Sequence, residues 1–122
     1  MSGKIFKEMI NCTNMLELKE KKCVPCDEGT PPLNREEIKG YMDQLQAGWE
    51  VMRDKTLRKH FPFENFRRGM AFAQKIALLA EQENHHPDLC IHYTGVDVEL
   101  STHVIGGLSV NDFIMAAKIE HI

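Results

Sequence analysis

Residues 96–101 read Val-Asp-Val-Glu-Leu-Ser, so apolar and polar side chains alternate without interruption. A period of two is typical of a β-strand that buries one face and exposes the other. A Thr-Gly pair, which favours a turn, comes directly before this stretch. Residues 89–93 precede the turn and place Leu89, Ile91 and Tyr93 on one face of another strand. The two strands are therefore predicted to form a β-hairpin.

A second hairpin is predicted earlier in the chain. Residues 49–52, Trp-Glu-Val-Met, form a short apolar strand, and residues 56–61 form the strand that returns. The intervening Arg-Asp-Lys is polar, as expected for a turn, and Pro62 ends the second strand. Two hairpins in one short chain favour a single antiparallel sheet.

Three stretches have the apolar periodicity of helices. The first begins after Asn34, where Glu37 completes a capping box, and is expected to end at Gly48. The longest is predicted over residues 63–84, with apolar positions that form a wide stripe. Because Pro87 disfavours helical backbone in the residue before it, this helix is expected to end near His86.

The last helix is predicted to begin after Ser109. That residue is a good N-cap, and Asp112 stands at the reciprocal position of a capping box. The predicted order is α-β-β-α-β-β-α, which is an α+β fold with a four-stranded antiparallel sheet and helices packed on one face. The uncovered face and edges of such a sheet favour self-association into a homo-oligomer.

The domain is predicted to span residues 31–122, after a flexible extension over residues 1–30. Cys23 and Cys26 in this extension form half of a zinc-ribbon motif, but no second pair follows. We therefore expect the extension to be dispensable for the main chemistry. The sequence leaves open whether residues 1–14 belong to the natural chain.

Composition excludes several classes of function. The chain has 122 residues and a formal charge of −3, which argues against nucleic acid as a direct partner because phosphate binding needs a basic surface. No apolar run approaches the ~20 residues of a membrane span, and residues 1–18 lack the apolar core of a signal peptide. The expected location is therefore cytoplasmic, where the four cysteines would be reduced.

Titratable chemistry concentrates in residues 81–87, Glu-Gln-Glu-Asn-His-His-Pro. His85 and His86 close the long helix, and the hairpin should bring His103 to the same rim of the sheet. Histidine titrates near neutral pH, so three converging imidazoles indicate acid–base catalysis. The polar anchors expected around them are Glu81, Ser101 and Thr102.

A metal site is the competing interpretation. Glu81, His85, His86 and His103 could supply three nitrogens and one oxygen to zinc. However, adjacent histidines rarely reach the same ion, and helix-borne zinc sites space their ligands at i and i+4. We therefore expect no metal at this site.

The same residues resemble the pterin-4a-carbinolamine dehydratase family over about residues 31–122. The resemblance lies in five separated elements, which are Glu81-x-x-x-His85-His86-Pro87, Tyr93, Leu100-Ser101-Thr102-His103, Gly107-Leu108-Ser109 and Asp112. The Cys23-x-x-Cys26 segment resembles extensions of bacterial members. This sequence departs from some members at Leu89, where they carry tryptophan, which puts the preference for the substrate's side chain in doubt.

The resemblance implies an α-β sandwich assembled as a homodimer or homotetramer. It also implies loss of water from a 4a-hydroxytetrahydropterin, which gives the quinonoid dihydropterin used in tetrahydrobiopterin recycling. This chemistry needs no metal, nucleotide or redox cofactor. The physiological pterin, and the presence of an aromatic amino acid hydroxylase as partner, are left open.

The residues then take different expected roles. Because His85 and His103 come from different elements, they are expected to act as acid and base, and His86 is expected to position the substrate. Asn84, Ser101 and Thr102 are candidates for reading the polar edge of a pterin. Asp112 is expected to cap the last helix, with a possible second role in orienting a histidine.

A second class of function is also open. Family members in animals act as a dimerisation cofactor for a homeodomain transcription factor, which would make the chain a binding module. The retained histidines favour the enzyme, because a scaffold alone would not require them.

Overall fold

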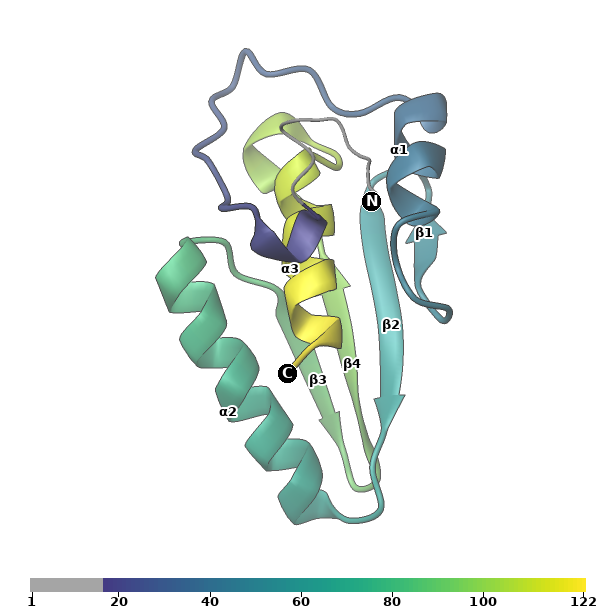
Figure 1. Cartoon of the computed structure of the whole chain (residues 1–122), viewed down its shortest axis with the longest axis vertical. Coiled ribbons are helices and arrows are strands. Elements are labelled where there is room, and N and C mark those ends of the chain that lie inside the picture. The colour runs from purple at the N-terminus through teal and green to yellow at the C-terminus, as the bar shows by residue number, and fades with distance from the viewer. Residues whose placement is uncertain (1–16) are drawn as a thin grey trace, which may run out of the picture.

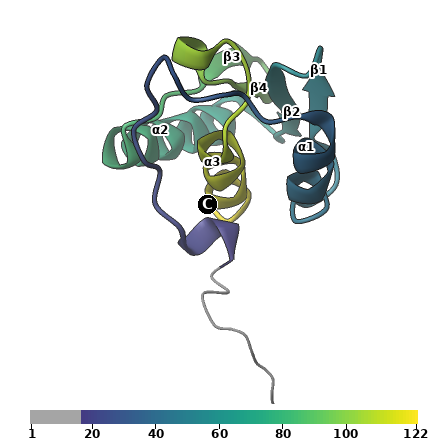
Figure 2. The ribbon, with the colours of Figure 1, turned by 90° about the horizontal axis from the view of Figure 1, so that it is seen from above.

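The computed structural model describes residues 17–122 and contains one four-stranded antiparallel sheet with three α-helices on one of its faces (Figures 1 and 2). The spatial order of the strands is β1-β2-β4-β3, and the predicted α+β architecture is confirmed. Along the chain the elements are α1 (Arg35–Met42), β1 (Glu50–Met52), β2 (Thr56–Pro62), α2 (Phe66–Glu83), β3 (Asp88–His92), β4 (Gly95–Leu100) and α3 (Val110–Glu120). Two short 3-10 helices, η1 (Leu18–Glu20) and η2 (His103–Ile105), flank them.

Both predicted hairpins are present, with strand limits that differ by at most one residue. β3 and β4 pair from His92↔Gly95 to Asp88↔Glu99, so each strand begins and ends one residue earlier than the alternation indicated. Tyr93, predicted as the last residue of this strand, lies in the turn and is 79% exposed. The alternation of β4 has the expected consequence, because Val96, Val98 and Leu100 are fully buried beneath the helices.

The core lies between the sheet and α3, which crosses its middle (Figure 1). α3 is buried along most of its length, and its Phe113 and Met115 have no exposed surface. α2 contributes a stripe of small residues, and Gly69 on this stripe lies against β4. A Cβ there would lie 3.5 Å from a methyl carbon of Val96, which is an ordinary contact distance, so alanine would also fit. Small residues on α2 thus allow the long helix to pack closely on the central strand.

α1 ends earlier than the sequence predicted. Its capping box at Asn34 and Glu37 is present, but the helix stops at Met42 instead of continuing to Gly48. The connection that follows is fixed by α3, because a carboxylate oxygen of Glu120 accepts bonds from Gln46 N at 2.6 Å and Trp49 Nε1 at 3.0 Å. These long-range bonds hold the connection in place, so α1 does not continue through it.

α2 is shorter than predicted at both ends. It begins after Asn65, whose side chain accepts from Arg68 N, and it ends at Glu83 instead of near His86. Asn84 adopts the left-handed conformation, with φ 53° and ψ 41°. Asparagine tolerates this conformation better than most residues. The reversal at Asn84 releases the two histidines from the helix and starts the path toward β3.

Residues 17–30 do not form a loose extension. Leu18 is 3% exposed in the core, and the Lys118 ammonium donates to Lys19 O at 3.0 Å. Figure 1 shows this segment passing across α3 toward α1. The expectation of a flexible extension therefore does not fit its described part, whereas residues 1–16 lie outside the described residues.

None of the helices described between residues 17 and 122 is long and apolar enough to cross a membrane.

Candidate active site

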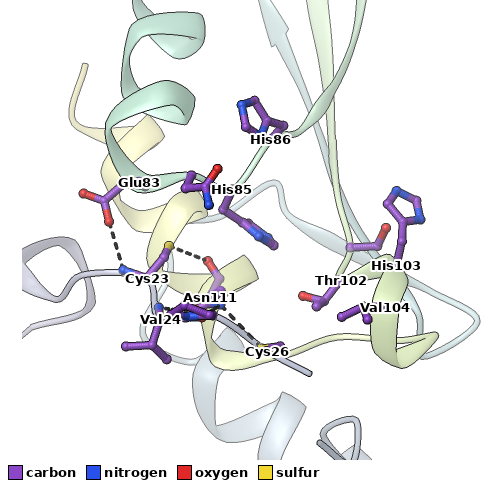
Figure 3. A pocket seen from close by; sticks show the side chains of 13 residues that line it. Cys23, Val24, Cys26, Glu83, His85, His86, Thr102, His103, Val104 and Asn111 are labelled. Carbon is purple, nitrogen blue, oxygen red and sulfur yellow. Dashed lines mark hydrogen bonds between the residues drawn. The ribbon is translucent and has the colours of Figure 1, made fainter. Parts of the chain in front are cut away.

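A pocket of about 420 Å³ opens at the rim where α2 ends and β4 leaves the sheet (Figure 3). Three segments far apart in the sequence form its walls, namely residues 23–26, 83–86 and 101–104, together with Asn111 of α3. All three histidines that the sequence singled out line this pocket. The predicted meeting of the helix end with the end of β4 is therefore present.

His85 turns inward from the end of α2. Its backbone N–H donates to Ala80 O at 3.2 Å, which closes the helix around left-handed Asn84. Its Nε2 lies 2.6 Å from Oδ1 of Asp112, and the His85 side chain is 12% exposed. In this arrangement the carboxylate accepts a hydrogen bond from Nε2–H, which fixes the orientation of the ring. The other ring nitrogen, Nδ1, makes no bond to Asp112.

Asp112 combines the two roles considered from the sequence. Its second oxygen, Oδ2, accepts from Ser109 N at 3.0 Å, which completes the capping box of α3. The same oxygen accepts from Thr102 Oγ1 at 2.8 Å. Asp112 has no exposed surface, so these bonds replace the water that a buried carboxylate loses. One carboxylate thus joins the cap of α3, the end of β4 and His85.

His86 points away from its neighbour. Its Nε2 lies 2.6 Å from Oε2 of Glu81, and both side chains are more than half exposed. Glu81 does not line the pocket, although we expected it to contact substrate directly. It sits one turn back on α2, so it reaches His86 and not the interior. Its contact with the site is therefore indirect.

His103 enters the pocket from the opposite wall, at the start of η2 (Figure 3). It is exposed, and its ring makes no hydrogen bond to any residue in the described part of the chain. The rings of His85 and His103 are therefore held to different degrees. His85 is held by a buried carboxylate, whereas His103 is free to rotate.

The 23–26 segment forms a wall that the sequence did not indicate. Asn111, 4% exposed, holds this segment through the backbone of Val24: its Oδ1 accepts from Val24 N at 3.0 Å and its Nδ2 donates to Val24 O at 2.5 Å. The Cys23 thiol lies 3.7 Å from Asn111 O, and Cys26 Sγ lies 3.6 Å from Asn111 Nδ2 (Figure 3). The side-chain amide of Asn111 therefore holds Val24 and Cys26 of this segment.

Glu83 anchors the same segment from α2. Its Oε1 accepts from Cys23 N at 2.9 Å, and its Oε2 lies 3.6 Å from Lys118 Nζ. Burial raises the pKa of Glu83, but the Cys23 N–H and the Lys118 charge outweigh burial and leave this pKa below its ordinary value. Burial and then the Glu83 charge raise the pKa of Cys23 to about 12, so Cys23 is a neutral thiol at physiological pH.

A family model described as pterin 4 alpha carbinolamine dehydratase matches residues 31–122. The chain belongs to this family.

Curated relatives provisionally named pterin-4-alpha-carbinolamine dehydratase support the assignment. The protein from Alkaliphilus metalliredigens is 46% identical over 106 residues, which is 87% of this chain and 96% of the relative. The protein from Rickettsia canadensis is 50% identical over 106 residues, which is 87% of this chain and 97% of the relative. Both sequence matches extend to residues before residue 31, the part of the chain that also supplies residues 23–26 to the pocket.

A solved pterin dehydratase has the same fold. The crystal structure of a transcriptional coactivator/pterin dehydratase from Brucella melitensis superposes with a TM-score of 0.69 at 31% identity. The match covers 74% of this chain and 96% of that protein.

The pocket of this dehydratase-family chain was only partly predictable. Local signals located His85, His86, His103 and Asp112, because a helix end, a strand end and a capping box each leave a mark in the sequence. No comparable signal marks Asn111, since its partners are 85 to 88 residues away in the chain.

We predict that Asn111→Ala weakens substrate binding. The change removes the side-chain bonds from Asn111 to Val24 and Cys26 but leaves the Glu83 bond to Cys23, and a loss of one or two kcal/mol corresponds to about 5- to 30-fold in an equilibrium. Steady-state kinetics should show KM rising within that range. The matched control is Asn34→Ala, which removes the helix cap of α1 away from the pocket and should lower stability without raising KM. Equal KM values for wild type and Asn111→Ala would contradict the role of this wall.

Proposed function

We propose that the chain catalyses the dehydration of a 4a-hydroxytetrahydropterin to the quinonoid dihydropterin, within tetrahydrobiopterin recycling. The observation that carries the proposal is the pocket in which His85 and His103 face one space from two different elements. Membership of the pterin-4a-carbinolamine dehydratase family and the names of its relatives support the same reaction. The composition and the free thiols among the described cysteines favour a cytoplasmic enzyme.

The reaction needs one acid and one base. The substrate carries a hydroxyl on a ring carbon beside an N–H group. Its C–O bond breaks as the nitrogen lone pair forms a C=N bond, the hydroxyl leaves as water after taking a proton from the acid, and the nitrogen gives its proton to the base. Two imidazoles on either side of a flat ring can perform both transfers near neutral pH. The atoms and electrons of this step balance without a metal, nucleotide or redox cofactor.

The restraints on the two histidines favour a division of roles. The Asp112 carboxylate accepts a hydrogen bond from Nε2–H of His85, so neutral His85 has its lone pair at Nδ1 and is suited to be the base. The negative charge of Asp112 also stabilises the imidazolium that proton transfer creates. His103 has no such partner in the described structure and can turn to donate a proton to the leaving hydroxyl.

Substrate positioning falls to the remaining polar groups. Asn84 and Ser101 line the pocket and can read the donor and acceptor row of a pterin's pyrimidine edge. Backbone groups around Thr102 are candidates for the same role, and its hydroxyl, which bonds to Asp112 and Ser109, also positions Asp112. His86, oriented by Glu81, contacts substrate at the pocket edge.

We infer further that the enzyme is a homodimer or homotetramer. β3 is an edge strand of five residues, and Ile91 on it is 37% exposed. The outer surface of α2 also exposes Phe66 at 47% and Leu78 at 67%. An unpaired edge and exposed apolar side chains favour association with a second copy.

Sedimentation equilibrium at micromolar concentration tests the assembly. The expected mass is that of two or four chains, because burying the β3 edge and the apolar positions of α2 stabilises association. A mass of 14.0 kDa, that of one chain, would contradict it.

The histidines provide the test of the dehydratase itself. General acid–base catalysis contributes roughly 100- to 10,000-fold, so His85→Ala and His103→Ala should each lower kcat within that range in stopped-flow assays with a 4a-hydroxytetrahydropterin. Each variant should lose one limb of the pH–rate profile. His86→Ala should instead raise KM with little change in kcat, because it removes binding shared by ground and transition states.

The uncatalysed dehydration, measured without protein, sets the floor for these rates. One imidazole could also replace the other, so the double variant His85→Ala/His103→Ala completes the experiment. If the two single variants and the double variant all turn over like wild type, the dehydratase proposal fails and a binding module takes its place.

A further inference from the structure

A second cluster of titratable side chains lies on the open face of the sheet, near the turn between β3 and β4. Cys90 and His92 alternate on β3, so both point away from the helices. Asp97 of β4 stands directly opposite Cys90 on one side and opposite His60 of β2 on the other. Three neighbouring strands thus bring one thiol, two imidazoles and one carboxylate together. The pocket lies at the other end of β4, beyond Leu100.

The donor atoms of this cluster are already close together. Those of Cys90, His92 and Asp97 all lie within 4.8 Å of one another. His92 Nε2 is 2.9 Å from Asp97 Oδ2, and His60 Nδ1 is 2.6 Å from Asp97 Oδ1. Around a tetrahedral zinc ion, donors at 2.0–2.3 Å from the metal are separated by roughly 3.5 Å. Cys90, His60 and His92 are exposed, so their side chains can rotate toward a shared ion without moving the backbone.

Gly95 makes room for the fourth donor. A Cβ at this position would lie 2.5 Å from Cε1 and 2.8 Å from Nε2 of the His60 ring. Real Cβ contacts are never so short, so the His60 ring can lean over β4 only because residue 95 is glycine. This lean brings the His60 and His92 rings to a centroid distance of 6.2 Å.

We propose that Cys90, His92 and Asp97, with His60 as the fourth ligand, form a binding site for a divalent transition metal of the zinc class. A thiolate with two imidazoles and one carboxylate suits Zn²⁺ or Co²⁺, whereas Mg²⁺ and Ca²⁺ prefer oxygen donors alone. The metal would replace the ring protons that now lie between the histidines and Asp97. It would link β2, β4 and β3 at the end of the sheet farthest from the pocket.

A simpler interpretation is an ion-pair cluster around Asp97. Hydrogen bonds from His60 and then His92 hold the pKa of Asp97 to about 2, and Arg58 Nη2 lies 3.5 Å from Asp97 Oδ2. That interpretation explains the two histidines, but it gives Cys90 no part. The thiol is therefore the residue that separates the two interpretations.

Cobalt titration of the full chain tests the proposal, because four-coordinate Co²⁺ bound to a thiolate has visible d–d bands and a sulfur-to-metal charge-transfer band. Wild type should bind Co²⁺ with both signals, and Zn²⁺ should displace it. Cys90→Ser should abolish the charge-transfer band, and His92→Ala should weaken binding at least tenfold. His60→Ala should weaken it to a similar extent. The matched control is Cys23→Ser/Cys26→Ser, which removes the other described thiols and should leave the spectrum unchanged.

A thermal readout accompanies the spectra. Zn²⁺ should raise the Tm of wild type and of the Cys23→Ser/Cys26→Ser control, but not that of Cys90→Ser, since a ligand that binds only the folded state stabilises it. Circular dichroism checks that each variant is folded. Absence of cobalt bands in wild type would overturn the site, as would bands that survive Cys90→Ser or vanish in the Cys23→Ser/Cys26→Ser control. An unchanged affinity in His60→Ala would overturn the four-ligand arrangement.

Discussion

The carboxylate of Asp112 is the constraint on which the pocket depends. It is fully buried, and its two oxygens bond to groups from three parts of the chain: His85 after α2, Thr102 after β4, and Ser109 at the start of α3. A buried carboxylate is stable only when such partners replace its lost hydration. The carboxylate that caps the start of α3 therefore also fixes the ring of the proposed catalytic base.

The sequence predicted those features that depend on neighbouring residues. Alternation defined β4, and reciprocal Ser109–Asp112 and Asn34–Glu37 pairs defined the starts of two helices. The features it missed depend on contacts between distant residues. Glu120 ends α1 early by bonding to the segment after it, and Asn111 draws residues 23–26 over the pocket. Local spacing in the sequence marks neither Glu120 nor Asn111 as a partner of these segments. Without the Asn111 contacts, the sequence predicts no part in the pocket for the first 30 residues.

The two ends of β4 carry different chemistry. At the end near Leu100 the chain turns into η2, and buried groups hold a pocket against the helices. At the end near Gly95 the polar residues of the alternation face away from the helices and gather around Asp97. The alternation of β4 therefore places apolar side chains on the buried side of the sheet, beneath the helices. It places Asp97, a ligand of the proposed metal site, on the open side.

The most direct test of this account is the stopped-flow dehydration rate of Asp112→Asn, alone and combined with His85→Ala. The amide keeps the shape of the carboxylate but removes the charge that orients His85. We predict that Asp112→Asn lowers kcat on the order of 100-fold, and that adding His85→Ala lowers it little further, because the effects of residues that act as a unit are not additive. Folded Asp112→Asn protein that turns over like wild type, or two losses that multiply, would contradict it.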